Sequence, residues 1–96
     1  MDSNAFVISA VLWRHPGPTP WHFVTLPRGI ADRIRPHAMK VGFGSVRVQA
    51  CIGDTAWKTS LFPDKKSGSY VLPVKAEVRK KELLEEGAEV VVFLEM

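Results

Sequence analysis

The segment Tyr70-Val71-Leu72-Pro73 decides the fold, because a short apolar run ends there at a proline and a helical pattern follows directly. Residues Lys75 to Leu84 predict a helix with Val78 on its buried face, and Gly87 offers the left-handed geometry that commonly ends a helix. Val90 to Leu94 is apolar at every position, which predicts a strand covered on both faces. This stretch therefore predicts strand, helix, strand.

The same order of features occurs earlier in the chain. Phe23-Val24-Thr25-Leu26-Pro27 leads into a predicted helix over residues 28–35, which we expect Pro36 to end. When Leu26-Pro27 is aligned with Leu72-Pro73, Arg33 aligns with Arg79. We interpret the two stretches as a pseudo-twofold repeat of strand-strand-helix-strand units, in which neither half closes a core alone. The half-units cover approximately residues 1–53 and 54–96.

Four further strands are predicted over residues 6–13, 21–26, 45–52 and 55–62. Every second residue from Val46 to Ile52 is apolar, which predicts one buried face. Gly53-Asp54 joins this strand to the next as a hairpin turn. The proline-rich residues 15–20 and the polar residues 63–68 are predicted loops, since proline cannot pair in a ladder. The predicted fold class is mainly β with two short helices.

Composition limits the possibilities further. The 96 residues, 46% hydrophobic and 24% charged, are typical of one globular domain over residues 1–96. One cysteine, Cys51, excludes a disulfide framework and a thiolate metal cage. The apolar run at 5–13 follows no basic segment and is too short to cross a bilayer, so we expect a cytoplasmic protein with no membrane contact.

Five blocks of the sequence together form a recognisable pattern. They are Trp21-His22-Phe23-Val24-Thr25-Leu26-Pro27, Gly42-Phe43-Gly44-Ser45-Val46-Arg47-Val48, Trp57-Lys58-Thr59-Ser60-Leu61-Phe62-Pro63, Tyr70-Val71-Leu72-Pro73-Val74-Lys75 and Val78-Arg79-Lys80. In these blocks the chain resembles a small bacterial family of unknown function. The resemblance covers nearly the whole chain, and the blocks occur in the family's order.

The resemblance implies a double-split β-barrel, the fold class of the AbrB, MazE and MraZ barrels. Those proteins assemble the barrel from two short chains, whereas here one chain supplies both halves, so we expect a monomer, with a homodimer as the alternative. Two features differ from AbrB-type units. Ala88 follows Gly87 where those units typically have Asp, and the first loop carries only Arg14 and His15 as basic groups.

No catalytic or metal-binding set is recognisable, so we expect neither an enzyme nor a cofactor. The three histidines lack metal-ligand spacing, and no glycine-rich phosphate loop occurs. Alternation predicts that Arg47, Gln49, Lys58 and Ser60 share one face of the hairpin, which is either a solvated surface or an anion site. The candidate anion-binding residues are Arg47, Lys58, Ser60, Lys75 and Arg79.

Arg79 also has a structural interpretation. Together with Arg33 it is predicted to anchor the helices to the barrel through carboxylates such as Asp32 or Glu77. The aromatic side chains likewise have two interpretations. Most are expected in the core, and a base-stacking platform would instead require them to be exposed beside basic groups. The large aromatics concerned are Trp13, Trp21, Trp57 and Tyr70.

The charge distribution keeps two functions open. Residues 58–81 hold seven basic and two acidic side chains, and residues 82–96 hold five glutamates with no basic group. The first prediction is a non-catalytic small barrel that binds a small anionic ligand or a protein partner. The alternative is an AbrB-like nucleic-acid-binding barrel, which the basic segment favours. A solvated helix end explains the same segment without any partner.

Overall fold

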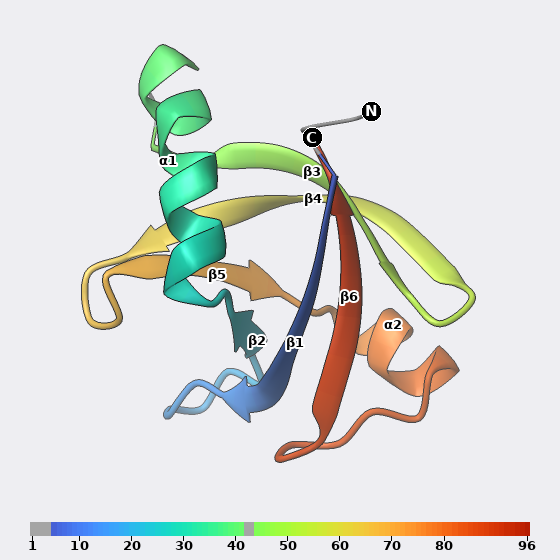
Figure 1. Ribbon diagram of the computed structural model, residues 1–96. Coiled ribbons are helices and arrows are strands. Elements are labelled where there is room, and N and C mark those ends of the chain that lie inside the picture. The colour runs from blue at the N-terminus through green and yellow to red at the C-terminus, as the bar shows by residue number, and fades with distance from the viewer. Residues whose placement is uncertain (1–4, 42–43) are drawn as a thin grey trace.

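The computed structural model describes residues 5–41 and 44–96, with side chains for 5–37 and 44–96. Met1 to Asn4, and the Gly42 and Phe43 of the family resemblance, lie outside the described residues. The elements in chain order are β1 (Ala5–Arg14), β2 (His22–Thr25), α1 (Arg28–Val41), β3 (Val46–Ile52), β4 (Thr55–Asp64), β5 (Ser69–Pro73), α2 (Ala76–Lys81) and β6 (Glu89–Glu95) (Figure 1).

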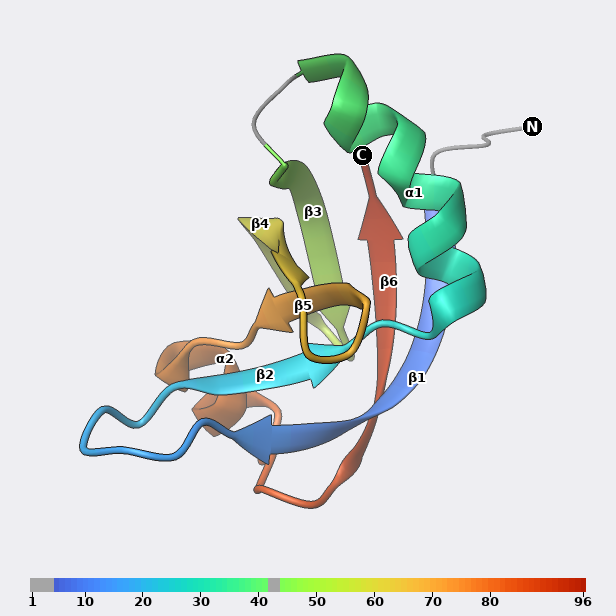
Figure 2. The ribbon, with the colours of Figure 1, turned by 90° about the vertical axis from the view of Figure 1, so that its left-hand side faces the viewer.

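The strands form one closed antiparallel barrel. Its order is β1-β2-β5-β4-β3-β6, and β6 pairs back onto β1. The two helices lie on opposite sides of this barrel, α1 against β3 and β5 and α2 beyond the end of β5 (Figures 1 and 2). The prediction of a mainly β chain with two helices is confirmed, although α1 spans 14 residues.

The barrel interior is filled by the alternating apolar residues of the strands. Val46, Val48, Ala50 and Ile52 are all buried, which confirms the predicted face of β3. The hairpin at Gly53-Asp54 is confirmed, because Ile52 pairs with Thr55 across the turn. Gly53 has a φ of 57°, a left-handed conformation that favours glycine. The hairpin register therefore follows from local sequence.

Helix α1 continues through Pro36 to Val41, so the prediction that Pro36 ends the helix is wrong. Proline removes one backbone hydrogen bond, but its fixed φ near −65° is helical. Ala31 and Ile34, in the turns before it, are fully buried against the barrel. This packing holds the first half of the helix, and the chain continues in the same geometry beyond the proline.

Strand β6 has one buried face and one exposed face, so the prediction that both faces are covered is wrong. Val91 and Phe93 are 49% and 53% exposed, while Val90, Val92 and Leu94 are buried. Neither helix covers this side of the barrel, and the outer residues of β6 therefore remain at the surface (Figure 1). Among the described residues, no helix is both long and apolar enough to span a membrane.

Candidate functional site

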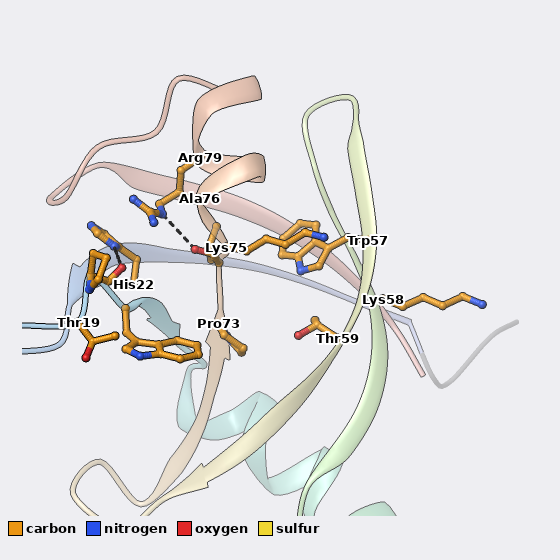
Figure 3. A pocket seen from close by; sticks show the side chains of 12 residues that line it. Thr19, His22, Trp57, Lys58, Thr59, Pro73, Lys75, Ala76 and Arg79 are labelled. Atoms are coloured by element: carbon orange, nitrogen blue, oxygen red, sulfur yellow. Dashed lines mark hydrogen bonds between the residues drawn. The ribbon is translucent and has the colours of Figure 1, made fainter.

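A cavity of about 390 Å³ lies where β5 leads into α2, and we call it the Arg79 cavity. Its walls come from the β1–β2 loop, the inward side of β4 and the first turn of α2 (Figure 3). Trp57, Pro73 and Val74 make much of the wall apolar, and His22, Lys75 and Arg79 add polar groups. A concave, mainly apolar site with a few polar groups is typical of ligand pockets.

Arg79 is half-buried in the wall of this cavity. Its Nε donates a hydrogen bond to the Val74 carbonyl across 3.1 Å, which ties the guanidinium to the β5–α2 junction. Within the part of the chain that the structure describes, Arg79 makes no other side-chain hydrogen bond and no ion pair. The Nη groups therefore remain available to a ligand.

The predicted carboxylate anchors of the two arginines are not formed. Asp32 pairs with Arg35 at 2.7 Å, and Glu77 pairs with Lys81 at 3.4 Å. Arg33 instead lies over the Phe6 ring, with its guanidinium carbon 4.9 Å from the ring centroid. Asp32 and Glu77 are thus paired with other bases, and Glu82, three residues after Arg79, accepts from the Thr55 hydroxyl. Arg79 bonds to a backbone carbonyl instead.

Lys75 and Lys58 both line the Arg79 cavity but point in different directions. Lys75 immediately precedes α2, is exposed, and extends toward Trp57 in Figure 3. Lys58 points away from the cavity, because on β4 it alternates with the buried Trp57. Of the two lysines, only Lys75 directs its side chain along the cavity.

The remaining candidate residues form a separate surface, which we call the hairpin face. Arg47 lies opposite Ser60, and Gln49 lies opposite Lys58, so the four residues share the outer side of β3 and β4 as predicted. A shallow cavity of about 260 Å³ there also includes Glu95, which pairs with Gln49 from β6. The five candidate residues are thus divided between two sites. Lys75 and Arg79 lie in the Arg79 cavity, and Arg47 and Ser60 lie on the hairpin face. Lys58 borders both hollows but directs its side chain to the hairpin face.

A third hollow, of about 600 Å³, lies on the outer side of β2, β5 and β4, and we call it the Trp21 groove. Trp21 and Phe62 in its wall are 51% and 46% exposed. Trp57 and Tyr70 are buried as expected, but Trp21 does not belong to the core. Sequence reasoning did not identify this groove as a site. The feature of the sequence that could have indicated the groove is the alternation of Trp21, Phe23 and Thr25, which places the three side chains on one strand face.

Strand register explains why the aromatic side chains gather there. Phe23 lies opposite Trp13 on one side and Pro73 on the other, and Val71 lies between Thr25 and Phe62 in the same way. Trp21 stacks on Phe23 with an interplanar angle of 12° and a centroid distance of 6.3 Å. Directly opposed side chains on one sheet face are close neighbours, so four strands supply one apolar surface.

His22 is the histidine that lines the Arg79 cavity, and its ring makes one hydrogen bond there. Nδ1 of His22 donates a hydrogen bond to the Pro20 carbonyl across 3.0 Å, which fixes the ring and leaves Nε2 free to accept. Among residues 5–41 and 44–96, no group of three or more His, Cys, Asp or Glu side chains could hold a metal ion.

Comparison with known proteins adds the family. Residues 9–94 match the sequence model of a family described as a domain of unknown function, DUF1905. The chain belongs to the DUF1905 family. The predicted membership of a family of unknown function is thereby confirmed, and every residue of the Arg79 cavity lies within the matched segment. No curated protein matches the chain.

Proposed function

We propose that this DUF1905 domain is a non-catalytic binding module and that the Arg79 cavity receives a small anionic ligand. One observation carries the proposal. The Arg79 guanidinium is held by its Nε alone, in a concave wall that contains no carboxylate among the described residues. Guanidinium Nη groups bind phosphate or carboxylate oxygens in pairs, which gives such contacts both strength and orientation.

The surroundings support an anion rather than a cation. Lys75 adds a second positive charge, and His22 adds a polar ring. The apolar side chains of Trp57 and Val74 in the wall lower the local dielectric constant, which strengthens the attraction between opposite charges. The hairpin face is a weaker candidate, because the carboxylate of Glu95 lines its cavity beside Arg47 and Lys58.

The test is a titration of the full chain with inorganic phosphate and acetate, followed by NMR chemical shifts. We expect shifts in the residues of the Arg79 cavity. Lys75→Met and Arg79→Met should each weaken binding by about tenfold or more, because hydrogen bonds to charged groups contribute about 1.5–3 kcal/mol. Lys80→Met is the matched control, since this exposed lysine lies on the same helix outside the cavity.

The outcomes separate the proposal from nonspecific charge attraction. Equal weakening by Lys80→Met and Lys75→Met would show attraction to the net charge of α2 instead of a site. If phosphate and acetate leave the resonances of the Arg79 cavity unchanged, the anion proposal is wrong.

Nucleic-acid binding of the AbrB type is the second candidate. It is supported by the exposed Lys65 and Lys66 at the β4–β5 turn and by Lys80 and Lys81 on α2. Binding to duplex DNA should weaken steeply as salt rises, because each phosphate contact releases a counterion. A gel-shift series from low to physiological salt tests this, and no shift at low salt would exclude it.

For the fold, we infer a double-split barrel built from two related half-units. Exchanging β1 with β4, β2 with β5 and β3 with β6 reproduces the observed strand order, which supports the inference. Each half also places a helix after its second strand. The test is superposition of the two halves in an experimental structure. The inference fails if the best superposition does not bring Leu26 onto Leu72 and Arg33 onto Arg79.

A further inference from the structure

We propose that the ligand of the Arg79 cavity carries a planar aromatic ring, which lies in the Trp21 groove while the anionic group lies at Lys75 and Arg79. This inference rests on the proposed function and names the class of its ligand. The shared chemistry is a ring joined to a phosphate or carboxylate. Nucleoside monophosphates and simpler aryl phosphates both have it.

The two hollows are neighbours with a common wall. Thr19, Trp21 and Pro73 line both the Arg79 cavity and the Trp21 groove. Trp21 is thus in contact with both spaces, and a single ligand that passes this side chain reaches from one to the other. Neither space needs to accommodate the whole molecule.

The Arg79 cavity and the Trp21 groove differ in chemistry, and the difference fits a ligand with one anionic and one apolar part. Within the described chain, the lining of the Trp21 groove includes no Lys, Arg, Asp or Glu, whereas Lys75 and Arg79 lie in the adjoining cavity. Exposed Trp21 and Phe62 present large apolar surfaces that a ring would remove from water. The groove therefore favours the ring, which would leave water on contact with these apolar surfaces. The anionic group is favoured in the Arg79 cavity, where the positive charges lie.

The groove is also held in place before any ligand arrives. Nε1 of Trp13 donates a hydrogen bond to Oγ1 of Thr25 across 2.9 Å, and the Trp13 ring lies 5.1 Å from that of Phe23. Phe23 in turn supports Trp21. Because these rings are already fixed by neighbours, stacking a further ring on them immobilises few additional rotamers.

The experiment compares four ligands on the full chain by NMR titration: inorganic phosphate, cyclohexyl phosphate, phenyl phosphate and adenosine monophosphate. Phenyl phosphate should bind at least about fivefold more tightly than inorganic phosphate, because stacking of one ring contributes about 1–3 kcal/mol. Cyclohexyl phosphate should fall between them. The monophosphate should equal or exceed phenyl phosphate if the ligand is a nucleotide, and bind more weakly if it is a smaller aryl anion.

Two variants locate the ring. Phe62 lines the Trp21 groove but not the Arg79 cavity, so Phe62→Ala should reduce the phenyl phosphate advantage and leave inorganic phosphate binding unchanged. Trp21→Ala should remove the advantage. Phe93→Ala is the matched control, because Phe93 is 53% exposed on β6 and lines neither space. Thermal melting of each variant confirms that it is folded.

The results distinguish this inference from the proposed function. If inorganic phosphate binds but phenyl phosphate binds no more tightly, the inference of an aromatic ring in the Trp21 groove is wrong, and the proposed anion site in the Arg79 cavity remains supported. If the phenyl advantage persists in both Phe62→Ala and Trp21→Ala, the ring lies elsewhere and the inference is overturned. If no ligand binds, both proposals fail. If a single-stranded oligonucleotide binds about a hundredfold more tightly than the monophosphate, the surface serves a strand and the small-ligand inference is overturned.

Discussion

The hydroxyl of Thr55 donates a hydrogen bond to the carboxylate of Glu82 across 2.6 Å, and this contact joins the β3–β4 hairpin to the end of α2. Glu82 is the residue directly after the last turn of α2, and its backbone N–H still bonds to the Val78 carbonyl. The contact therefore ties the side of the barrel that carries Trp57 to the helix that carries Arg79.

Replacing Thr55 by valine should destabilise the fold by about 1–2 kcal/mol, because a half-buried carboxylate loses a hydrogen-bond donor. Chemical denaturation measures this difference. Ser9→Ala is a matched control, since Ser9 donates to Glu89 at 2.7 Å on the exposed surface of β1 and β6. We expect a smaller effect there, and equal effects would mean that the Thr55 contact has no special role.

Gly53 should not tolerate alanine. Its φ of 57° disfavours a side chain, and a Cβ at this position would overlap the Glu82 carboxylate. Gly53→Ala should destabilise the fold by about 1–2 kcal/mol through the conformation, and further through the Thr55 hydrogen bond that Glu82 loses when its flexible carboxylate moves aside. In a double-mutant cycle with Glu82→Ala, the overlap disappears and the second substitution should offset part of the cost. Strict additivity of the two changes would argue against the overlap.

Leu83 offers a stabilising substitution. It has a φ of 55° although it is not glycine, and its side chain is 87% exposed, so it contributes little packing. Asparagine adopts this conformation more readily, and Leu83→Asn should stabilise the protein by about 0.5–1 kcal/mol. Thermal melting tests this, with Leu83→Ala as the control that keeps the strain. A melting temperature of Leu83→Asn at or below that of Leu83→Ala would contradict it.

Asp64 should contribute to the pH dependence of the protein's stability. The Ser67 side chain, and then the backbone N–H groups of Ser67 and Lys66, lower the pKa of Asp64 below its ordinary value of 3.8. A carboxyl with a lowered folded-state pKa stabilises the protein above its unfolded pKa, and this contribution is lost as pH falls. The wild type should therefore exceed Asp64→Asn in melting temperature at pH 7, and the gap should narrow below 3.8. A gap that widens in acid would refute this assignment.

Local patterns in the sequence predict much of the barrel. The alternation from Val46 to Ile52 and the Gly53-Asp54 turn determine the β3–β4 hairpin and its register, which places Arg47 opposite Ser60. Val78 is buried in α2 as its position indicates, and Gly87 has the expected positive φ of 92°. Each of these features depends on neighbours that are close in sequence, and each is therefore readable without the fold.

The misjudged features depend on contacts that are distant in sequence or on backbone partners. Whether Val91 and Phe93 are covered depends on where the helices pack, which β6 itself does not encode. Arg79 bonds to a carbonyl, and a search for nearby carboxylates does not find such a partner. Trp21 and Phe62 meet in one groove only because β5 lies between β2 and β4 in the ring. The candidate site was divided for another reason: Arg47, Lys58 and Ser60 lie on the outer side of the β3–β4 hairpin, whereas Lys75 and Arg79 line the cavity at the β5–α2 junction.

Closure of the barrel by a single chain restricts how this domain can meet other molecules. The strands pair in a ring, but the pairings are partial: among the described strands, residues 5–11 of β1 pair only with β6, and residues 55–61 of β4 pair only with β3. An extended peptide that joins a sheet needs an open row of N–H and C=O groups, and only such singly paired stretches leave one. Detachment of any one strand would expose two such rows at once, and partial unfolding is therefore the state from which this protein is expected to aggregate.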